Sequence, residues 1–221
     1  MSSIFTSSIG KKLMMSLAGV FLITFLLVHM GLNLLVIIFE DPMVYNKAAH
    51  FMSTNILIKI FEIVLFGGLL LHVIYALILQ VENWIARPRR YNKANYANTS
   101  FFSKFMVHTA AIVLVFLVIH LVDFYIKAKF GHAAEIHVDG VAYHDFASEI
   151  IDKFKVLPFV VFYIAAFIFL GFHLIHGFQS AFKTMGLDHK KYTPFIQLLS
   201  IIYTVVVVAG YTIIPLVVYF M

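Results

Sequence analysis

The stretch PFVVFYIAAFIFLGFHLIHGFQSAFK, residues 158–183, is almost wholly apolar and long enough to cross a lipid bilayer. It nevertheless contains two histidines, His173 and His176, and no acidic residue. An ionisable side chain at membrane depth is costly in free energy, so a histidine in such a segment marks a functional site. The rest of the sequence must explain what one of these histidines binds.

The composition is that of an integral membrane protein. Of the 221 residues, 62% are hydrophobic and only 12% are charged, whereas about a quarter of a soluble domain is charged. The mean hydropathy is +0.95. The absence of cysteine excludes disulfides and cysteine-ligated iron–sulfur clusters within the chain. The net charge of +5 comes with no run of Lys or Arg that would follow a nucleic acid, so no nucleic-acid partner is expected.

Five apolar segments are predicted to span the membrane as helices, in a single all-α domain that covers residues 1–221. They cover about residues 13–39, 56–84, 104–126, 158–183 and 195–219. Pro215 is expected to kink the last span. Residues 43–55 are expected to form a polar loop. Alternation around Asp139-Gly140 predicts a β-hairpin over residues 136–143, and residues 148–155 are expected to form a short surface helix.

The distribution of Lys and Arg predicts that the N-terminus lies inside and the C-terminus outside. With this orientation, the inner side holds only two of the 11 acidic residues, Glu82 and Asp188. The same side holds most of the basic residues, namely Lys11, Lys12, Arg87, Arg89, Arg90, Lys93, Lys104, Lys183, Lys190 and Lys191. We therefore expect a multi-pass protein of the cytoplasmic (inner) cell membrane, in contact with lipid.

Four consecutive spans each place one histidine deep in the predicted membrane. Counted from the ends of their spans, His29 and His120 lie at an outer level, whereas His72 and His173 lie at an inner level. The rise of an α-helix separates the two levels by roughly 10–15 Å. If the first four helices form an antiparallel bundle, each level draws its histidines from diagonal helices. Such a pair can bind a flat haem from both faces, which predicts two stacked bis-histidine b haems.

Two glycines support the inner pair. Gly177 lies four residues after His173 and Gly68 lies four residues before His72, so each shares a helix face with its histidine and leaves room for a ring. Depth alone allows either His173 or His176 as the ligand, and Gly177 favours His173. The other histidines near span ends or in loops are interpreted as interface, propionate-side or solvated residues: His108, His176, His132, His137 and His144.

Around these residues the chain resembles the single-chain, five-helix, di-haem cytochrome b subunit of succinate dehydrogenases and quinol:fumarate reductases. The resembling segments are FLLVHMGLN at residues 25–33, AAHFM at 48–52, LLLHVIYA at 69–76, VIHLVDFYI at 118–126 and GFHLIHGFQSAFKTMGL at 171–187. The last segment is similar to the family's His-x-x-x-Gly pattern with a closing glycine, which falls here on His173, Gly177 and Gly186. This resemblance implies His173 as the fourth haem ligand.

The resemblance also implies a function and partners. The chain would be the membrane anchor of succinate dehydrogenase or fumarate reductase (respiratory complex II), whose dicarboxylate site lies on a separate flavoprotein subunit. An iron–sulfur subunit would dock on the cytoplasmic face and exchange electrons with a membrane quinone through the two haems; menaquinone is favoured. An oligomer of the whole complex is compatible with this reading. The docking residues would be Arg87, Arg89, Arg90, Lys183, Lys190 and Lys191.

Quinone chemistry needs a proton partner near the outer haem. Glu62 is the candidate catalytic acid, because a partly buried carboxyl group can be tuned toward neutral pH. His50 and Asn33 are the next candidates for quinone contacts. Some fumarate reductases of this type have a glutamate just before the fourth ligand that is thought to return protons across the membrane. Residues 170–172 are Leu-Gly-Phe here, so no such path is expected.

Two other functions stay open on the sequence. The chain could be the di-haem b subunit of another quinone-linked complex, such as a hydrogenase or a formate dehydrogenase. It could instead be a transporter that uses intramembrane histidines to carry metal ions or protons. Co-purification of a flavin-bearing partner and the spectrum of the reduced protein distinguish the three functions.

Overall fold

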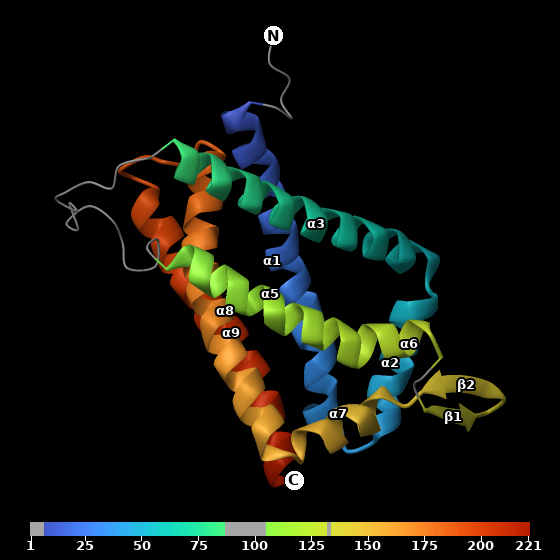
Figure 1. Cartoon of the computed structure of the whole chain (residues 1–221). Coiled ribbons are helices and arrows are strands. Elements are labelled where there is room, and N and C mark those ends of the chain that lie inside the picture. Colours follow the sequence, from blue (N-terminus) through green and yellow to red (C-terminus); the bar gives the residue numbers. More distant parts are fainter. Residues whose placement is uncertain (1–6, 87–104, 132–133) are drawn as a thin grey trace.

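The computed structural model describes residues 7–86, 105–131 and 134–221. Within these ranges five helical segments are long and apolar enough to span a membrane: α1 (Ser8–Ile38), α3 (Ile56–Ile85), Met106–Lys129, α8 (Leu157–Thr184) and α9 (Thr193–Phe220) (Figure 1). The third of these consists of α5 (Met106–His120), the π-helix η2 (Leu121–Ile126) and the single turn α6 (Lys127–Lys129). The structure thus has the five spanning-length helices that the sequence predicts.

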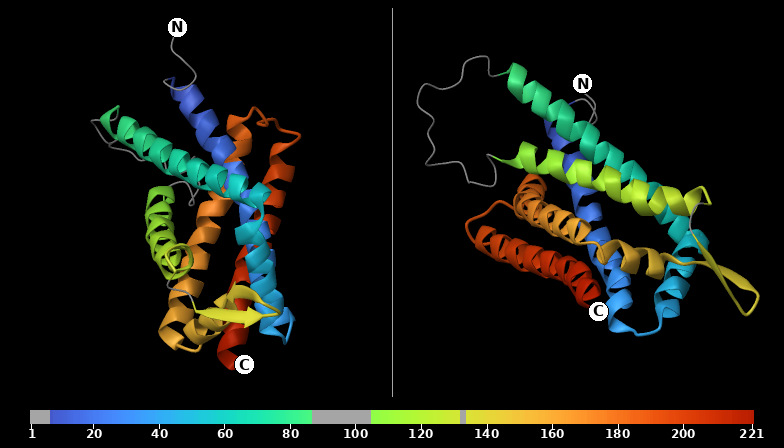
Figure 2. Two further views of the ribbon diagram at one scale, coloured as in Figure 1. Left: turned by 90° about the vertical axis from the view of Figure 1, so that its right-hand side faces the viewer. Right: turned by 60° about the horizontal axis from the view of Figure 1, so that its bottom comes forward.

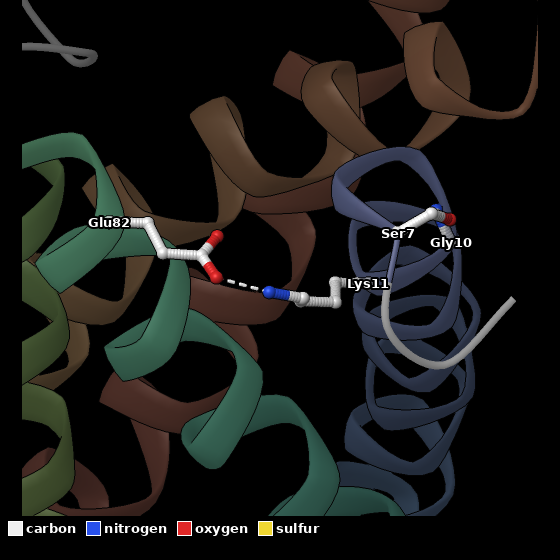
Figure 3. Close-up of polar contacts among 4 residues, drawn as sticks. All are labelled: Ser7, Gly10, Lys11 and Glu82. Atoms are coloured by element: carbon white, nitrogen blue, oxygen red, sulfur yellow. Dashed lines mark hydrogen bonds and ion pairs between the residues drawn. The ribbon is translucent and has the colours of Figure 1, made fainter. Parts of the chain in front are cut away.

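Residues 8–12, which precede the predicted first span, are part of the first helix. The Ser7 hydroxyl accepts a hydrogen bond from the Gly10 N–H at 3.1 Å and caps the first turn (Figure 3). For this reason α1 begins at Ser8, before the predicted start at residue 13. Lys11 forms an ion pair with Glu82 near the end of α3 (Figure 3). The start of α1 and the end of α3 therefore lie at the same end of the molecule.

The segment predicted as a polar loop, residues 43–55, is helical, so that prediction was wrong. Helix α2 (Pro42–Thr54) begins after Asp41, whose carboxylate accepts a hydrogen bond from the Met43 N–H at 2.9 Å. Pro42 suits the first helical position because its fixed φ matches the helix and its missing N–H would have no partner there. Polarity alone suggested a loop, whereas the capping residues specify a short helix.

The other short elements follow the sequence prediction. Strands β1 (Glu135–Val138) and β2 (Val141–His144) pair antiparallel, and Asp139 and Gly140 turn between them with positive φ angles of 51° and 78°. Helix α7 (Phe146–Phe154) follows. The hairpin, α2 and α7 gather at the end of the molecule where the C-terminus lies (Figures 1 and 2).

The tightest packing lies among α1, α8 and α9. A Cβ atom added at Gly171 on α8 would come within 2.9 Å of Val208 on α9, and one added at Gly210 on α9 would collide with the Met30 side chain on α1. Helix α3 packs on α1, and α5 packs on α8, both at a slant to the other three helices (Figures 1 and 2). Pro215 lies inside α9, which continues through it to Phe220. The antiparallel bundle around two haems stays a prediction.

A hydrogen-bond network joins α2 to α7 outside the spanning helices. Asn46 is only 1% exposed. Its side-chain N–H donates to Asp145 Oδ1 at 2.9 Å, and its carbonyl oxygen accepts from the Ala147 N–H at 3.0 Å. Burial alone would raise the pKa of the Asp145 carboxyl, but hydrogen bonds from Asn46 and Ser148 outweigh it and hold that pKa below its usual range.

This network is expected to loosen in acid. Because the pKa of Asp145 is lower in the folded state, its contribution to stability is present above the unfolded pKa of about 4 and is lost as the pH falls through the folded value. Hydrogen exchange of the α7 amides in detergent, corrected for the intrinsic exchange rate, should show this loosening. The change Asp145→Asn should reduce the acid dependence, whereas Asp152→Asn, at an exposed site on the same helix, should leave it unchanged. Equal effects of both changes would contradict the assignment.

Candidate functional site

Two pairs of histidines face each other across helices that are distant in the sequence. The ring of His29 on α1 lies 5.8 Å from the ring of His120 at the end of α5, measured between centroids. The ring of His72 on α3 lies 6.3 Å from the ring of His173 on α8. These are the pairs that depth predicts, and His173 rather than His176 is the neighbour of His72.

The separations suit two axial ligands of one iron atom. A metal ion bound by one nitrogen of each ring at about 2 Å would hold the two ring centroids about 6 Å apart. The rings of each pair meet edge to face, with interplanar angles of 79° and 76°. Within the described residues, no group of three or more His, Asp or Glu side chains is placed to hold a metal ion. Two imidazoles on one haem iron need no such group.

Aromatic side chains fix the orientation of the outer pair. Phe25 stacks on His29 at 5.2 Å and 19°, and Phe116 stacks on His120 at 5.7 Å and 21°. The amide N–H of Asn33 donates to the main-chain carbonyl of His29 at 2.7 Å and lies 3.4 Å from each nitrogen of the His29 ring. Asn33 therefore lies beside the histidine of its own helix, one turn away. The π-helix η2 begins directly after His120, and such segments are frequent at functional sites.

In the inner pair, a contact with α1 determines which nitrogen of His72 carries the proton. His72 Nδ1 lies 3.2 Å from the main-chain carbonyl oxygen of Met15 on α1. Because a carbonyl oxygen only accepts, Nδ1 carries the proton and Nε2 keeps its lone pair, as in a metal-binding histidine held by a second partner. In the part of the chain that the structure describes, the buried Nδ1 atoms of His173 and His120 have no hydrogen-bond partner. Buried polar atoms normally have a hydrogen-bond partner, so these two atoms are exceptions within the described residues.

The glycine that faces a histidine ring in the structure is neither Gly68 nor Gly177. A Cβ atom on Gly68 would lie 3.7 Å from Phe21, and one on Gly177 would lie 3.9 Å from Met106, so neither would meet a histidine ring. Gly19 on α1 faces His72 instead, with a Cβ position 3.5 Å from the ring carbon Cε1. Gly19 lies one turn after Met15, but the contact joins two helices and no spacing within the sequence indicates it.

The Glu62 carboxylate and its two partners lie where α3 begins and the third span ends. Tyr125 donates a hydrogen bond to Glu62 Oε1, and Lys129 forms an ion pair with the same oxygen at 2.9 Å. The Tyr125 ring also packs on Phe66 of α3 at 4.8 Å. The Glu62 side chain is 23% exposed, partly buried as the sequence suggests. Tyr125 and Lys129 were missed, because Tyr125 lies in the π-helix η2 and Lys129 lies beyond the predicted end of the third span at residue 126.

The other candidate residues lie apart from this carboxylate. His50 on α2 packs on Tyr143 of the hairpin at 4.9 Å, and the described residues give no contact between His50 and Glu62. Asp123 on η2 forms an ion pair with Lys153 of α7. Of the predicted docking residues, Lys183, Lys190 and Lys191 are exposed at the end of α8 and in the loop after it. Arg87, Arg89 and Arg90, together with His132, lie outside the described residues.

Comparisons of the chain with protein-family models, with curated proteins and with solved structures found no match. The function is therefore argued from the residues and the geometry described above.

The contact between Gly19 and His72 predicts a selective effect of side-chain size. Gly19→Leu would force the His72 ring or α3 to move, and overpacking of this kind costs typically about 1–3 kcal/mol of unfolding free energy. Gly31→Leu, on the same helix, is the control, because a Cβ there meets nothing within 4 Å. Thermal unfolding in detergent should show a lower midpoint for Gly19→Leu only. Equal midpoints for the two variants would contradict the placement of His72 against Gly19.

Proposed function

We propose that the chain is the membrane anchor and di-haem cytochrome b subunit of a succinate:quinone oxidoreductase, either a succinate dehydrogenase or a quinol:fumarate reductase. The observation that supports this most is the arrangement of four histidines on four spans as two facing pairs, His29 with His120 and His72 with His173. A single intramembrane histidine has simpler explanations, but two pairs with the separation of axial ligands fit two b haems.

The four histidines would act as fixed ligands. When bound, the two haems supply one-electron transfer between the iron–sulfur subunit and a membrane quinone, with menaquinone favoured. Met15 holds the proton of His72 on Nδ1 and so leaves Nε2 for iron. Phe25 and Phe116 hold the outer rings and keep water away from them. In this proposal the N-terminus lies in the cytoplasm, and the exposed Lys183, Lys190 and Lys191 face the partner subunits.

Glu62 would exchange protons with the quinone at the outer end of the bundle. Tyr125 and Lys129 both bind its Oε1, so its other oxygen, Oε2, is the one that a quinone oxygen or a water molecule would meet. Lys129 also offers a positive charge beside a quinone oxygen that gains electron density. Asn33 would act through the position of His29, and His50, which packs on Tyr143, stays a candidate for a quinone contact.

Replacement of single ligands should remove the haems selectively. We expect His29→Ala and His120→Ala to lose the outer haem, and His72→Ala and His173→Ala to lose the inner one, because each haem needs both axial imidazoles. His176→Ala is the control and should keep both. Haem content per chain and the dithionite-reduced spectrum measure this. Loss of the outer haem alone from His72→Ala would refute the pairing.

The same purified protein separates the alternatives. A reduced spectrum without a b-type band, or zinc in place of iron, would reject the haem proposal and favour a histidine-based transporter. A b-type band with a hydrogenase or formate dehydrogenase partner, in place of a flavoprotein, would assign the chain to another quinone-linked complex. Co-purification of a flavin-bearing subunit that oxidises succinate or reduces fumarate is the result that we expect.

The proton role of Glu62 predicts a loss that depends on pH. Glu62→Gln keeps the shape and a hydrogen-bond acceptor but cannot take up a proton, so quinone reductase activity should fall by about 10²-fold or more, the usual range for a general acid–base group. Haem content should not change. Glu149→Gln, on helix α7, is the control. Wild-type activity with a wild-type pH profile in Glu62→Gln would exclude the role.

A further inference from the structure

We propose that Tyr203 and Tyr211 of α9 are positioning residues for His29, which they hold in place through the main chain of α1. The inference rests on the proposed function in one respect, namely that His29 is an outer haem ligand. It gives a role to a helix that supplies no histidine of its own.

Both tyrosines donate hydrogen bonds to carbonyl oxygens in the middle of α1. Tyr203 donates to Ile23 at 2.7 Å, and Tyr211 donates to Leu26 at 2.8 Å. Each of these carbonyls also accepts the helical N–H four residues later, so the tyrosine uses the second lone pair. Ile23 and Leu26 are three residues apart and share one face of α1, and the two tyrosines share one face of α9. The two bonds therefore fix both the depth and the rotation of α1 against α9.

The environment of Tyr211 makes this anchor rigid. Its side chain is 6% exposed and stacks on Phe167 of α8 at 5.3 Å and 26°. Gly210, its neighbour, packs directly against the Met30 side chain of α1. A tyrosine ring clamped between two helices cannot follow a movement of α1, so any shift of α1 breaks a hydrogen bond in an apolar environment where no water replaces it.

The anchor lies next to the histidine that it positions. His29 lies three residues after Leu26 and directly before Met30, and its ring lies 6.1 Å from the ring of Tyr211. A rotation of α1 would turn His29 away from His120, and a slide by one residue would displace it by about 1.5 Å along the axis. Axial ligation tolerates neither, because the nitrogen must stay within bonding distance of the iron. The inner pair depends less on these bonds, since His72 contacts α1 at Met15, eight residues before Ile23, and His173 belongs to α8.

The test compares the two haems within one protein. In the full chain with haem bound, the double variant Tyr203→Phe/Tyr211→Phe should shift the midpoint potential and the low-spin electron paramagnetic resonance signal of the outer haem, or lose that haem. The same properties of the inner haem should change less. His29→Ala identifies which signal is the outer one, and Tyr192→Phe, 51% exposed in the loop before α9, is the control. An unchanged outer signal, or an equal change in both haems, would overturn the inference.

A second measurement is independent of haem. The chain contains no cysteine, so spin labels at Leu27→Cys on α1 and Val206→Cys on α9, both on exposed faces, report the distance between these helices alone. The double tyrosine variant should broaden or shift that distance distribution, and an unchanged distribution would overturn the anchor. If wild-type protein binds no b haem, the proposed function fails, while the spin-label result still decides whether the tyrosines fix α1.

Discussion

A polar atom inside a bilayer must find its partner within the protein, and this constraint organises the spanning helices. Tyr203, Tyr211 and His72 meet it by donating to main-chain carbonyls of α1, which therefore carries more inter-helix hydrogen bonds than a simple spanning helix needs. The Nδ1 atoms of His120 and His173 are different, because they are buried and no described residue pairs with them. Each of these rings faces the imidazole of a histidine on another span.

The histidine pairs could be predicted from the sequence because the α-helix has a constant rise. Counting residues from span ends gives depth, and two side chains at equal depth on diagonal spans of a bundle can meet. Faces are harder to predict than depths. Gly68 and Gly177 share helix faces with His72 and His173, yet the glycine that faces a histidine ring is Gly19, on another helix. Contacts between helices depend on rotation and crossing, which the spacing of residues within one helix does not determine.

The same limit explains why the partners of Glu62 were not predicted from the sequence. Glu62 stands out in the sequence as an acid in an apolar segment, but its partner Tyr125 lies within η2 and its partner Lys129 follows η2. A π-helical turn changes the phase of the residues after it, so a regular 3.6-residue count cannot place them. Helix α2 was missed for a simpler reason. Its composition is polar, and its caps, Asp41 with Pro42 at one end and Asn55 at the other, are a more direct signal than hydropathy.

The hydrogen bonds between α9 and α1 also determine when α1 is fixed in place during synthesis. They join residues 180 and 185 positions apart in the chain, so the first span is fixed by the last. During synthesis α1 enters the membrane long before α9 exists, and until then its depth and rotation are set by lipid and by the earlier helices α2, α3 and α8. The site around His29 is therefore completed only when α9 has been inserted. A truncated chain without α9 would keep the outer histidines without the contacts that hold His29 in place.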